Sequence, residues 1–348
     1  MPDTFRALVV DKKDQEFSVK VNELSFGDLQ EGEVLIRVHY SGINYKDSLA
    51  AHPDGKIIRE YPAIPGIDLA GVVVSSDDPQ FREGDEVIAT SYEIGVSHFG
   101  GYSEYARIPG KWIVPLPEGL SLKEAMIIGT AGFTAALSVQ RLEKNNLTPE
   151  NGKVLVTGAT GGVGSFAVSI LASLGYEVEA STGKDAEHDY LKKLGADTVI
   201  SREEVYDGEL NPIRKQKWAA AVDPVGGEPL ASLLTQIQYG GSVAVSGLTG
   251  GTELPTSVIP FILRNINLLG IDSVNCPMET RVKTWQRFAN DIKPANLEEF
   301  VAEEVSLEQL PDVLPKLLKG QVSGRMIVKV KHGDGSGPVK KSPNSPVF

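Results

Sequence analysis

Hydrophobic and polar positions along the first third of the chain follow the pattern of short strands. Runs rich in β-branched residues recur there, at 6–10, 34–39, 71–74 and 85–89. In the second run, Val34, Ile36 and Val38 fall on one face, because successive strand side chains point to opposite sides. Pro79 and Gly84 separate the later runs and are typical turn residues. Many short strands punctuated in this way predict a barrel-like β domain.

The pattern changes after Leu120. Ser121 and Glu124 have the spacing of a capping box, and the uncharged stretch 125–140 that follows predicts a buried helix. From Lys153 onward, expected strands alternate with expected helices. The strands lie at 154–156, 177–181, 198–200, 218–222, 242–246 and 268–271, and the helices begin at 162 or occupy 185–194 and 230–237. This alternation predicts an α/β domain with a doubly wound parallel sheet.

The last part of the chain is expected to return to the first domain, with helices around 281–292 and 307–319 and a strand at 326–330. The tail 333–348 has almost no apolar residues, so we expect it to remain disordered and exclude it from the fold. The expected division is 1–125 with 276–332 for the β-rich domain, 126–275 for the wound sheet and 333–348 for the tail.

A glycine-rich turn follows the first strand of the predicted sheet. Residues 153–165 read KVLVTGATGGVGS, a strand, a turn of the GxGxxG type with Ala159 at its first glycine, and the start of a helix. Gly161 is expected to let the backbone approach a pyrophosphate, and Gly164 to let the helix pack on the strand. The helix N-terminus offers N–H groups and partial positive charge to phosphates. The pattern predicts dinucleotide binding; the alternative is a purely structural turn.

The end of the second strand indicates which dinucleotide. NAD sites usually carry Asp or Glu about 20 residues after the glycines, to bind the ribose 2′-hydroxyl. Here that position falls in 181–184, where there is no carboxylate. Lys184, and Arg202 just past the third strand, could bind a 2′-phosphate instead. The alternative is that both are solvated surface cations, but the missing acid favours NADP(H) over NAD.

Composition and charge remove several other classes of function. The length of 348 residues favours two domains, and the net charge of −12 argues against a nucleic-acid or anionic-membrane partner. Cys276 is the one cysteine, and the five histidines show no ligand spacing, so we expect no metal site. The stretch 154–176 is uncharged and long enough to span a bilayer, yet its glycines and hydroxyls favour a strand, a turn and a buried helix. With no signal-peptide pattern at the start, we expect a cytoplasmic protein.

Four motifs resemble the medium-chain dehydrogenase/reductase superfamily, and the resemblance extends over nearly all of 3–331. They are GINYKD at 42–47, IPGIDLAG at 64–71, GDEVI at 84–88 and GGYSEY at 100–105. The segments 127–135, 260–265 and 270–273 are similar to the acryloyl-CoA reductase subfamily of the zinc-free quinone oxidoreductase branch. The resemblance implies a GroES-like β-rich catalytic domain, a Rossmann NADP(H)-binding domain and a homodimer formed through an edge strand.

The departures from zinc alcohol dehydrogenases agree with this branch. Those enzymes carry a zinc-binding cysteine where this chain has Asn44, and Gly-His-Glu where it has Gly66, Ile67 and Asp68. Asparagine and isoleucine cannot replace thiolate and imidazole as zinc ligands. Without a Lewis acid, the plausible reaction is hydride donation to an acceptor already polarised by conjugation, such as an enone, an enoyl thioester or a quinone.

The resemblance also implies the residues that contact the cofactor. The pyrophosphate would be bound by Thr160, Gly161, Gly162 and Val163, and the adenosine 2′-phosphate by Thr182, Gly183, Lys184 and Arg202. Leu248 would contact the nicotinamide ribose side, Ile262 and Ser273 would line the nicotinamide pocket, and Tyr45 and Arg325 would reach the cofactor from the other domain. From the sequence alone, Leu248 and Ile262 would be core residues, Tyr45 a structural hydrogen-bonding residue and Arg325 a surface cation.

The leading hypothesis is an NADPH-dependent reductase of a small conjugated substrate, either acryloyl-CoA-like or a quinone. Hydride would add to the β-carbon, and a proton would reach the α-carbon or the oxygen from a donor that the sequence does not identify. Asn44 and Tyr45 could hydrogen-bond the developing enolate oxygen, or be purely structural. The alternative is a non-catalytic NADPH-binding protein, either a redox sensor or a structural protein.

Overall fold

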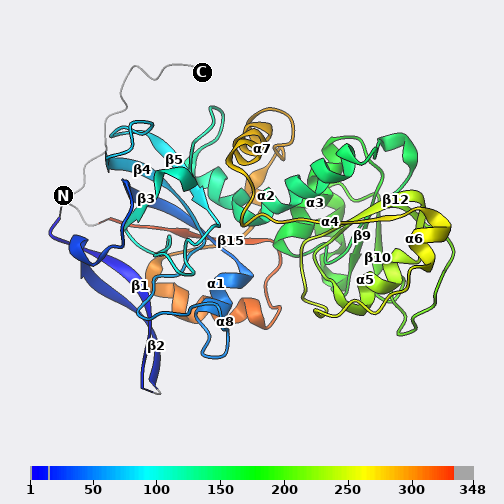
Figure 1. The fold of residues 1–348 in the computed structure, drawn as a ribbon, viewed down its shortest axis with the longest axis horizontal. Coiled ribbons are helices and arrows are strands. Elements are labelled where there is room, and N and C mark those ends of the chain that lie inside the picture. Colours follow the sequence, from blue (N-terminus) through cyan, green and yellow to red (C-terminus); the bar gives the residue numbers. More distant parts are fainter. Residues whose placement is uncertain (1, 15, 333–348) are drawn as a thin grey trace. The chain divides into compact units, whose positions relative to one another are not determined.

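The computed structural model describes residues 2–14 and 16–332, and the chain divides into two compact units (Figure 1). Of the described residues, the first unit comprises those up to 130, 274–289 and 297–332; the second comprises 131–273 and 290–296. The division therefore falls at 130/131 where the sequence suggested 125/126, and 290–296 belong to the second unit. The predicted disordered tail, 333–348, lies outside the described residues.

The first unit is built on strands that pair antiparallel, except for β14 and β15, which pair in parallel. The strands β1 (Thr4–Lys13) and β2 (Glu16–Ser25) pair as a two-stranded sheet. A seven-stranded sheet has the order β14-β15-β3-β4-β5-β7, with β6 also paired to β3. Its strands are β3 (Val34–Ile43), β4 (Asp68–Ser76), β5 (Glu86–Thr90), β6 (Tyr105–Ile108), β7 (Ile113–Pro115), β14 (Val301–Val305) and β15 (Arg325–Lys329). The helices of this unit are α1 (Tyr45–Ala50), α7 (Met278–Asn290) and α8 (Leu310–Leu318).

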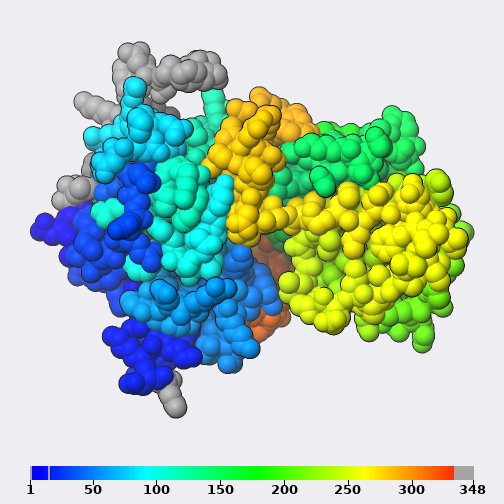
Figure 2. Space-filling view, viewed as in Figure 1, coloured from blue at the N-terminus to red at the C-terminus, as the bar shows by residue number. Residues whose placement is uncertain are grey.

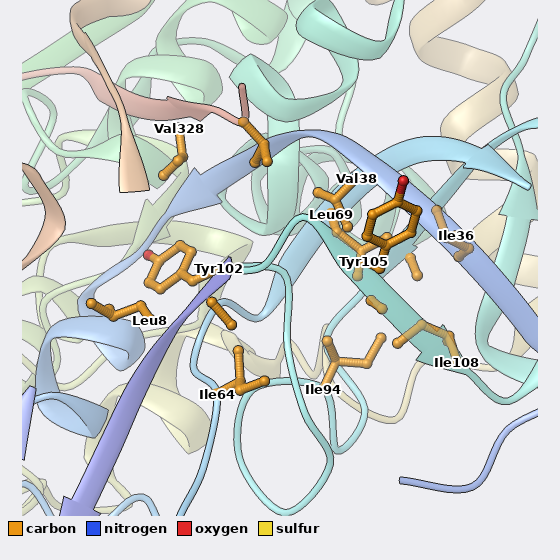
Figure 3. Close-up of a cluster of buried hydrophobic side chains, with 14 of the residues drawn as sticks. Leu8, Ile36, Val38, Ile64, Leu69, Ile94, Tyr102, Tyr105, Ile108 and Val328 are labelled. Atoms are coloured by element: carbon orange, nitrogen blue, oxygen red, sulfur yellow. The ribbon is translucent and has the colours of Figure 1, made fainter. Parts of the chain in front are cut away.

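The core of the first unit gathers around β3. Val34, Ile36 and Val38 are all fully buried, as the alternation predicted. Figure 3 shows Ile36 and Val38 among the side chains of Leu69, Tyr105 and Ile108, which come from β4 and β6. Burial of this apolar surface is the main favourable free-energy contribution to folding the sheet.

The second unit holds the doubly wound sheet. Six parallel strands have the order β10-β9-β8-β11-β12-β13, the nucleotide-binding order with its switch point between β8 and β11. They are β8 (Val154–Val156), β9 (Val178–Thr182), β10 (Thr198–Ser201), β11 (Trp218–Asp223), β12 (Ile237–Val245) and β13 (Asn267–Gly270). The helices are α3 (Gly162–Ser173), α4 (His188–Lys193), α5 (Gly227–Leu234) and α6 (Ile259–Arg264). The predicted α/β class with a Rossmann sheet is confirmed.

The long helix α2 (Leu122–Lys144) begins at the predicted capping box, where the Ser121 N–H donates to Glu124 Oε2 at 2.8 Å and the Glu124 N–H donates to Ser121 Oγ at 3.2 Å. It is interrupted at Gly129, whose backbone angles, φ 49° and ψ −159°, are not helical. By length and composition α2 could cross a membrane, but 78% of its most apolar window is buried inside the fold. That burial is what a core helix shows.

Several predicted elements need correction. The helix expected over 230–237 is wrong at its end, because α5 stops at Leu234 and Ile237 already begins β12. The expected helices at 185–194 and 307–319 each open with a 3₁₀ turn before α4 and α8. Elements that the sequence reading missed include the six-residue helices α1 and α6, which are too short for a hydrophobic period to show.

Candidate functional site

The glycine turn lies at the carboxyl end of β8, beside the switch point of the sheet. Gly161 caps α3 with φ −80° and ψ 170°, and its carbonyl accepts the first bond of that helix from the Ser165 N–H at 2.9 Å. The N–H groups of the first turn therefore have no partner within the helix. A Cβ built on Gly161 would meet only the Gly158 carbonyl oxygen, at 3.3 Å, so the protein itself leaves this position open toward a ligand.

Gly164 has the other role that the sequence predicted. A Cβ there would lie 2.3 Å from the Gly158 carbonyl oxygen and 2.7 Å from Ala159 Cα, both backbone atoms. The glycine is thus required for α3 to pack against the turn. Gly164 is therefore needed by the fold, whereas phosphate binding at Gly161 stays a prediction.

The four residues proposed for the 2′-phosphate come together at the ends of β9 and β10. These strands pair in parallel with Thr182 opposite Ser201, so Lys184 and Arg202 follow the ends of neighbouring strands. The Arg202 guanidinium lies against Gly183, since a Cβ at 183 would be 2.2 Å from Arg202 Nε. Thr182 Oγ1 accepts the Lys184 N–H at 3.1 Å, which shapes the turn.

Asp185, the first carboxylate after residues 181–184, does not take the place of the Asp or Glu that NAD sites usually carry. Asp185 opens the 3₁₀ turn Asp185–Glu187, and its side chain is fully exposed, 3.8 Å from His188 Nε2. The group Thr182, Gly183, Lys184 and Arg202 is called the adenosine pocket below, after the role predicted for it; it combines a hydroxyl and two cationic residues. This donor set fits a phosphate rather than a bare ribose hydroxyl.

A cavity of ≈ 530 Å³ lies at the other half of this sheet edge. It is lined at the ends of β12 and β13 by Val245, Ser246, Gly247, Leu248, Gly270, Ile271 and Asp272. The Ser246 hydroxyl oxygen is buried and makes no hydrogen bond within the described structure. An unsatisfied buried hydroxyl at the rim of such a cavity fits a polar ligand group, such as the carboxamide of a nicotinamide.

Leu248 and Ile262 are not core residues. Their side chains are 61% and 74% exposed, which overturns the alternative taken from the sequence. Ile262 belongs to α6, and Figure 2 shows the yellow segments that include α6 on the surface of the second unit. Exposed apolar side chains of this size are expected where a ligand or another surface covers them. Ser273, at the end of this unit, is half-buried.

The first unit contains a buried polar network around one ion pair. Arg325, at the start of β15, is 3% exposed, and its Nη2 lies 4.0 Å from Asp68 Oδ2 at the start of β4. Arg325 Nε donates to the Ile127 carbonyl at 2.9 Å, and Nη1 donates to the Ile43 carbonyl at 3.0 Å. The alternative of a surface cation is therefore wrong. The predicted contact of Arg325 with the cofactor stays a prediction.

Asn44 joins this network between the two charges. Its Nδ2 donates to Asp68 Oδ2 at 2.8 Å, and its Oδ1 accepts from Arg325 Nη1 at 3.2 Å. A flipped amide would present N–H to a cation and oxygen to an anion, so the partners determine the orientation. The next residue, Tyr45, begins α1 and is 46% exposed.

A second carboxylate, Asp47, holds the backbone around Asn44. Its oxygens accept the N–H groups of Asn44 and Ile67, both at 2.9 Å. Burial, together with a smaller contribution from the nearby Asp68, raises the pKa of Asp47 to about 7. Burial also lowers the pKa of Arg325 and raises that of Tyr102. The network is thus a low-dielectric site in which charge is held by specific partners.

The sequence reading expects no metal site at Asn44, Ile67 and Asp68. Across residues 2–14 and 16–332, no three His, Cys, Asp or Glu side chains are grouped as metal ligands would be. Ile67 is 3% exposed, and its backbone N–H is occupied by Asp47.

Comparison with known proteins identifies the family. Residues 30–118 match the alcohol dehydrogenase GroES-like domain, and residues 162–290 match the zinc-binding dehydrogenase domain. YhfP of Bacillus subtilis, named as a quinone oxidoreductase, is 62% identical over 95% of this chain and 100% of its own. The acrylyl-CoA reductase AcuI of Ruegeria pomeroyi is 49% identical over 94% of this chain and 99% of its own. The chain belongs to the medium-chain dehydrogenase/reductase superfamily, in the YhfP- and AcuI-like subfamily.

Solved structures of this subfamily superpose closely. The Bacillus subtilis protein yhfP with NAD bound has a TM-score of 0.92 at 62% identity, covering 94% of this chain and 100% of that one. The yhdH oxidoreductase from Salmonella enterica in complex with NADP has a TM-score of 0.91 at 47% identity, with the same coverage. The predicted GroES-like and Rossmann domains are confirmed by these matches.

Sequence reasoning missed part of the polar network of this medium-chain reductase. Asp47, Tyr102 and Thr130 were not singled out, although Thr130 is a hydroxyl inside an apolar and glycine-rich run and Tyr102 follows two glycines; Asp47 lies among polar residues. That pattern was the available signal, because a buried charge or hydroxyl persists in an apolar run only with partners. The partners themselves come from strands far apart in the chain.

Proposed function

We propose that this chain is an NADPH-dependent oxidoreductase that transfers hydride to a conjugated acceptor, either an enoyl thioester such as acryloyl-CoA or a quinone. The observation that carries the proposal is that the Arg202 guanidinium lies against Gly183, the residue before Lys184, so that two basic residues follow the adjoining ends of β9 and β10 in the adenosine pocket. The names of the relatives, acrylyl-CoA reductase and quinone oxidoreductase, supply the two acceptor classes.

The residues of the second unit would hold NADPH along the carboxyl edge of the sheet. The first turn of α3, from Gly161 to Val163 with Thr160 before it, would bind the pyrophosphate through backbone N–H groups. Lys184 and Arg202 would bind the 2′-phosphate through charge-assisted hydrogen bonds. The cavity with the unpaired Ser246 hydroxyl would take the nicotinamide, with Leu248, Ile262 and Ser273 around it. When bound, NADPH supplies a hydride from nicotinamide C4.

The first unit would contribute the groups that meet the acceptor. An amide nitrogen carries two protons, and Asp68 accepts one of those on Asn44 Nδ2. The second would donate to the acceptor oxygen as negative charge develops there, an oxyanion-stabilising role. Tyr45, exposed at the start of α1, and Arg325 would contact the cofactor from this unit. We assign no proton donor.

Both nicotinamide cofactors occur among the relatives' structures, one with NAD bound and others with NADP or NADPH. We favour NADP(H) for this chain because Lys184 and Arg202 would both stabilise a 2′-phosphate. The ribose 2′-hydroxyl of NAD would find no carboxylate to accept its hydrogen bond there. We further propose that the reaction needs no zinc, since Asn44 and Ile67 stand where the zinc-dependent relatives carry ligands.

We also propose a cytoplasmic homodimer that pairs through an edge strand of the six-stranded sheet, with no nucleic-acid or membrane partner. The strand β13 ends the sheet at one side, and edge strands offer unpaired backbone groups to a second copy. The net charge of −12 disfavours polyanionic partners. Sedimentation of the purified full chain would show a species of twice the monomer mass if this is correct.

The decisive experiment is a panel of acceptors. NADPH consumption by the purified chain would be followed with acryloyl-CoA, then with 1,4-benzoquinone and 9,10-phenanthrenequinone, and each assay repeated with NADH. We expect turnover with at least one acceptor and higher kcat/KM with NADPH. Tight NADPH binding without turnover of any acceptor would instead support the non-catalytic alternative, a redox sensor or structural protein.

A further inference from the structure

A pair of hydroxyl groups lies beside the Asp68–Asn44 contact, and neither belongs to any role described so far. Thr130 contacts Asp68 twice: its N–H donates to Oδ2 at 2.9 Å, and its Oγ1 lies 2.5 Å from Oδ1. Ser91, at the end of β5 and 2% exposed, has its Oγ 3.1 Å from Thr130 Oγ1. All these residues lie in the first unit.

The direction of this hydrogen-bond chain follows from chemistry. The carboxylate of Asp68 is paired with Arg325 and can only accept, so the Thr130 hydroxyl donates to it. The Thr130 oxygen then accepts from the Ser91 hydroxyl. Both carboxylate oxygens are thereby committed, Oδ1 to Thr130 and Oδ2 to Asn44 and the Thr130 N–H. Such chains polarise one another in a low dielectric.

Two unusual backbone conformations place these hydroxyls. Ser91 has φ 63°, in the left-handed region that a residue with a side chain rarely adopts. Gly129, just before Thr130, has φ 49°, and a Cβ there would lie 2.6 Å from Asp68 Oδ2. The break in α2 frees the Thr130 N–H from the helical ladder and directs it to the carboxylate. The left-handed conformation of Ser91 and the break at Gly129 therefore fix where the two hydroxyl groups lie.

We propose that Thr130, supported by Ser91, is a positioning residue for reduction: it locks the Asp68 carboxylate so that Asn44 keeps its amide N–H aimed at the acceptor oxygen. This inference rests on the proposed function. Asn44 is 9% exposed, and its amide has two charged partners, Arg325 Nη1 at 3.2 Å and Asp68 Oδ2 at 2.8 Å. A carboxylate free to rotate about its side chain would remove the shorter of these contacts and loosen the orientation of the amide. Orientation errors of this kind reduce turnover more than binding.

The test compares four variants of the full chain with the wild type. Thr130→Val removes the hydroxyl and keeps the shape and the N–H, Thr130→Ser keeps both donors, and Ser91→Ala removes the second hydroxyl. Thr134→Val is the matched control, because Thr134 is another buried threonine of α2 outside the Asp68 contact. Each variant is measured for kcat, KM for the acceptor, NADPH dissociation constant and melting temperature.

We expect the kcat of Thr130→Val to be roughly tenfold lower than that of the wild type, because the variant loses one hydrogen bond to a charged group. Its affinity for NADPH should be unchanged. Thr130→Ser should restore turnover to near the wild-type value, Ser91→Ala should lose a smaller factor, and Thr134→Val should lose nothing. A folded Thr130→Val with wild-type kcat would overturn the inference, as would an equal loss in Thr134→Val.

Two further outcomes separate the inference from the proposed function. If Thr130→Val does not fold, Ser91→Ala decides: unchanged kcat in that variant contradicts the hydroxyl chain. If the wild type reduces none of the acceptors in the panel, the proposed function fails and the positioning role fails with it. A wild type that turns over while the Thr130 and Ser91 variants match it would reject the positioning role alone.

Discussion

The guanidinium of Arg202 lies so close to Gly183 that a Cβ at residue 183 would be 2.2 Å from Nε and 2.5 Å from Cζ. Glycine at this position is therefore what lets a cation from the end of β10 reach across the end of β9. The clash would involve the far end of a flexible side chain, so the fold can absorb a methyl group there while the cation moves away.

Gly183→Ala should displace Arg202 and weaken NADPH binding roughly as removing one charge-assisted hydrogen bond would, by about 1.5 kcal/mol, with NADH binding unchanged. A double-mutant cycle with Arg202→Ala provides the measurement, because the two losses should not add if they act through the same guanidinium. Additive losses would mean that the glycine acts independently of Arg202.

Lys184→Ala should weaken NADPH binding by about 1.5–3 kcal/mol, since the ammonium group would no longer meet the 2′-phosphate. NADH carries no such phosphate, so its affinity should stay nearly the same. Fluorescence titration of both cofactors is the measurement, and Lys193→Ala, an exposed lysine on α4, is the control. Equal losses for the two cofactors would contradict the adenosine pocket.

Substitution of the two glycines of the turn should affect different properties, cofactor affinity at Gly161 and stability at Gly164. Gly161→Ala should leave the melting temperature of the free protein nearly unchanged and weaken NADPH at least about tenfold, because the added methyl enters the space left for the pyrophosphate. Gly164→Ala should instead lower the melting temperature without cofactor, since its Cβ would collide with backbone atoms. Wild-type NADPH affinity in Gly161→Ala would show that this glycine does not face the cofactor.

His39 predicts a pH dependence of stability. Burial, with Arg37 and His332 nearby, lowers the pKa of His39 from 6.5 to about 4. Between these pH values, His39 is protonated in the unfolded chain but neutral in the folded protein. The free energy of unfolding therefore falls as the pH falls through this window. The melting temperature of His39→Gln should therefore fall less on acidification than that of the wild type. His52→Gln, at an exposed histidine, should behave as the wild type.

Metal removal should leave the reaction intact. Dialysis against a chelator should not change kcat/KM, and elemental analysis should find no stoichiometric zinc, because Asn44 and Ile67 offer neither thiolate nor imidazole. One zinc per chain, lost together with activity, would refute the assignment.

Local patterns in the sequence determined the wound sheet and its cofactor edge. The glycine turn, the strand that precedes it and the cations that follow β9 and β10 are neighbours in the chain or sit at equivalent strand ends. Periodicity and strand-end position therefore suffice to predict them, as they predicted the buried face of β3. The same reasoning missed the helices α1 and α6, because each is shorter than two repeats of the helical hydrophobic pattern.

Only the tertiary structure decided the polar network and the exposure of the apolar residues near the cavity. Asp68, Thr130 and Arg325 come from β4, α2 and β15, and nothing in their local sequence says that they meet. Ile262 has the composition of a core residue, yet its side chain is exposed. The burial of a residue and the partners of its side chain depend on which distant segments pack together. Local patterns along the sequence do not show which segments these are.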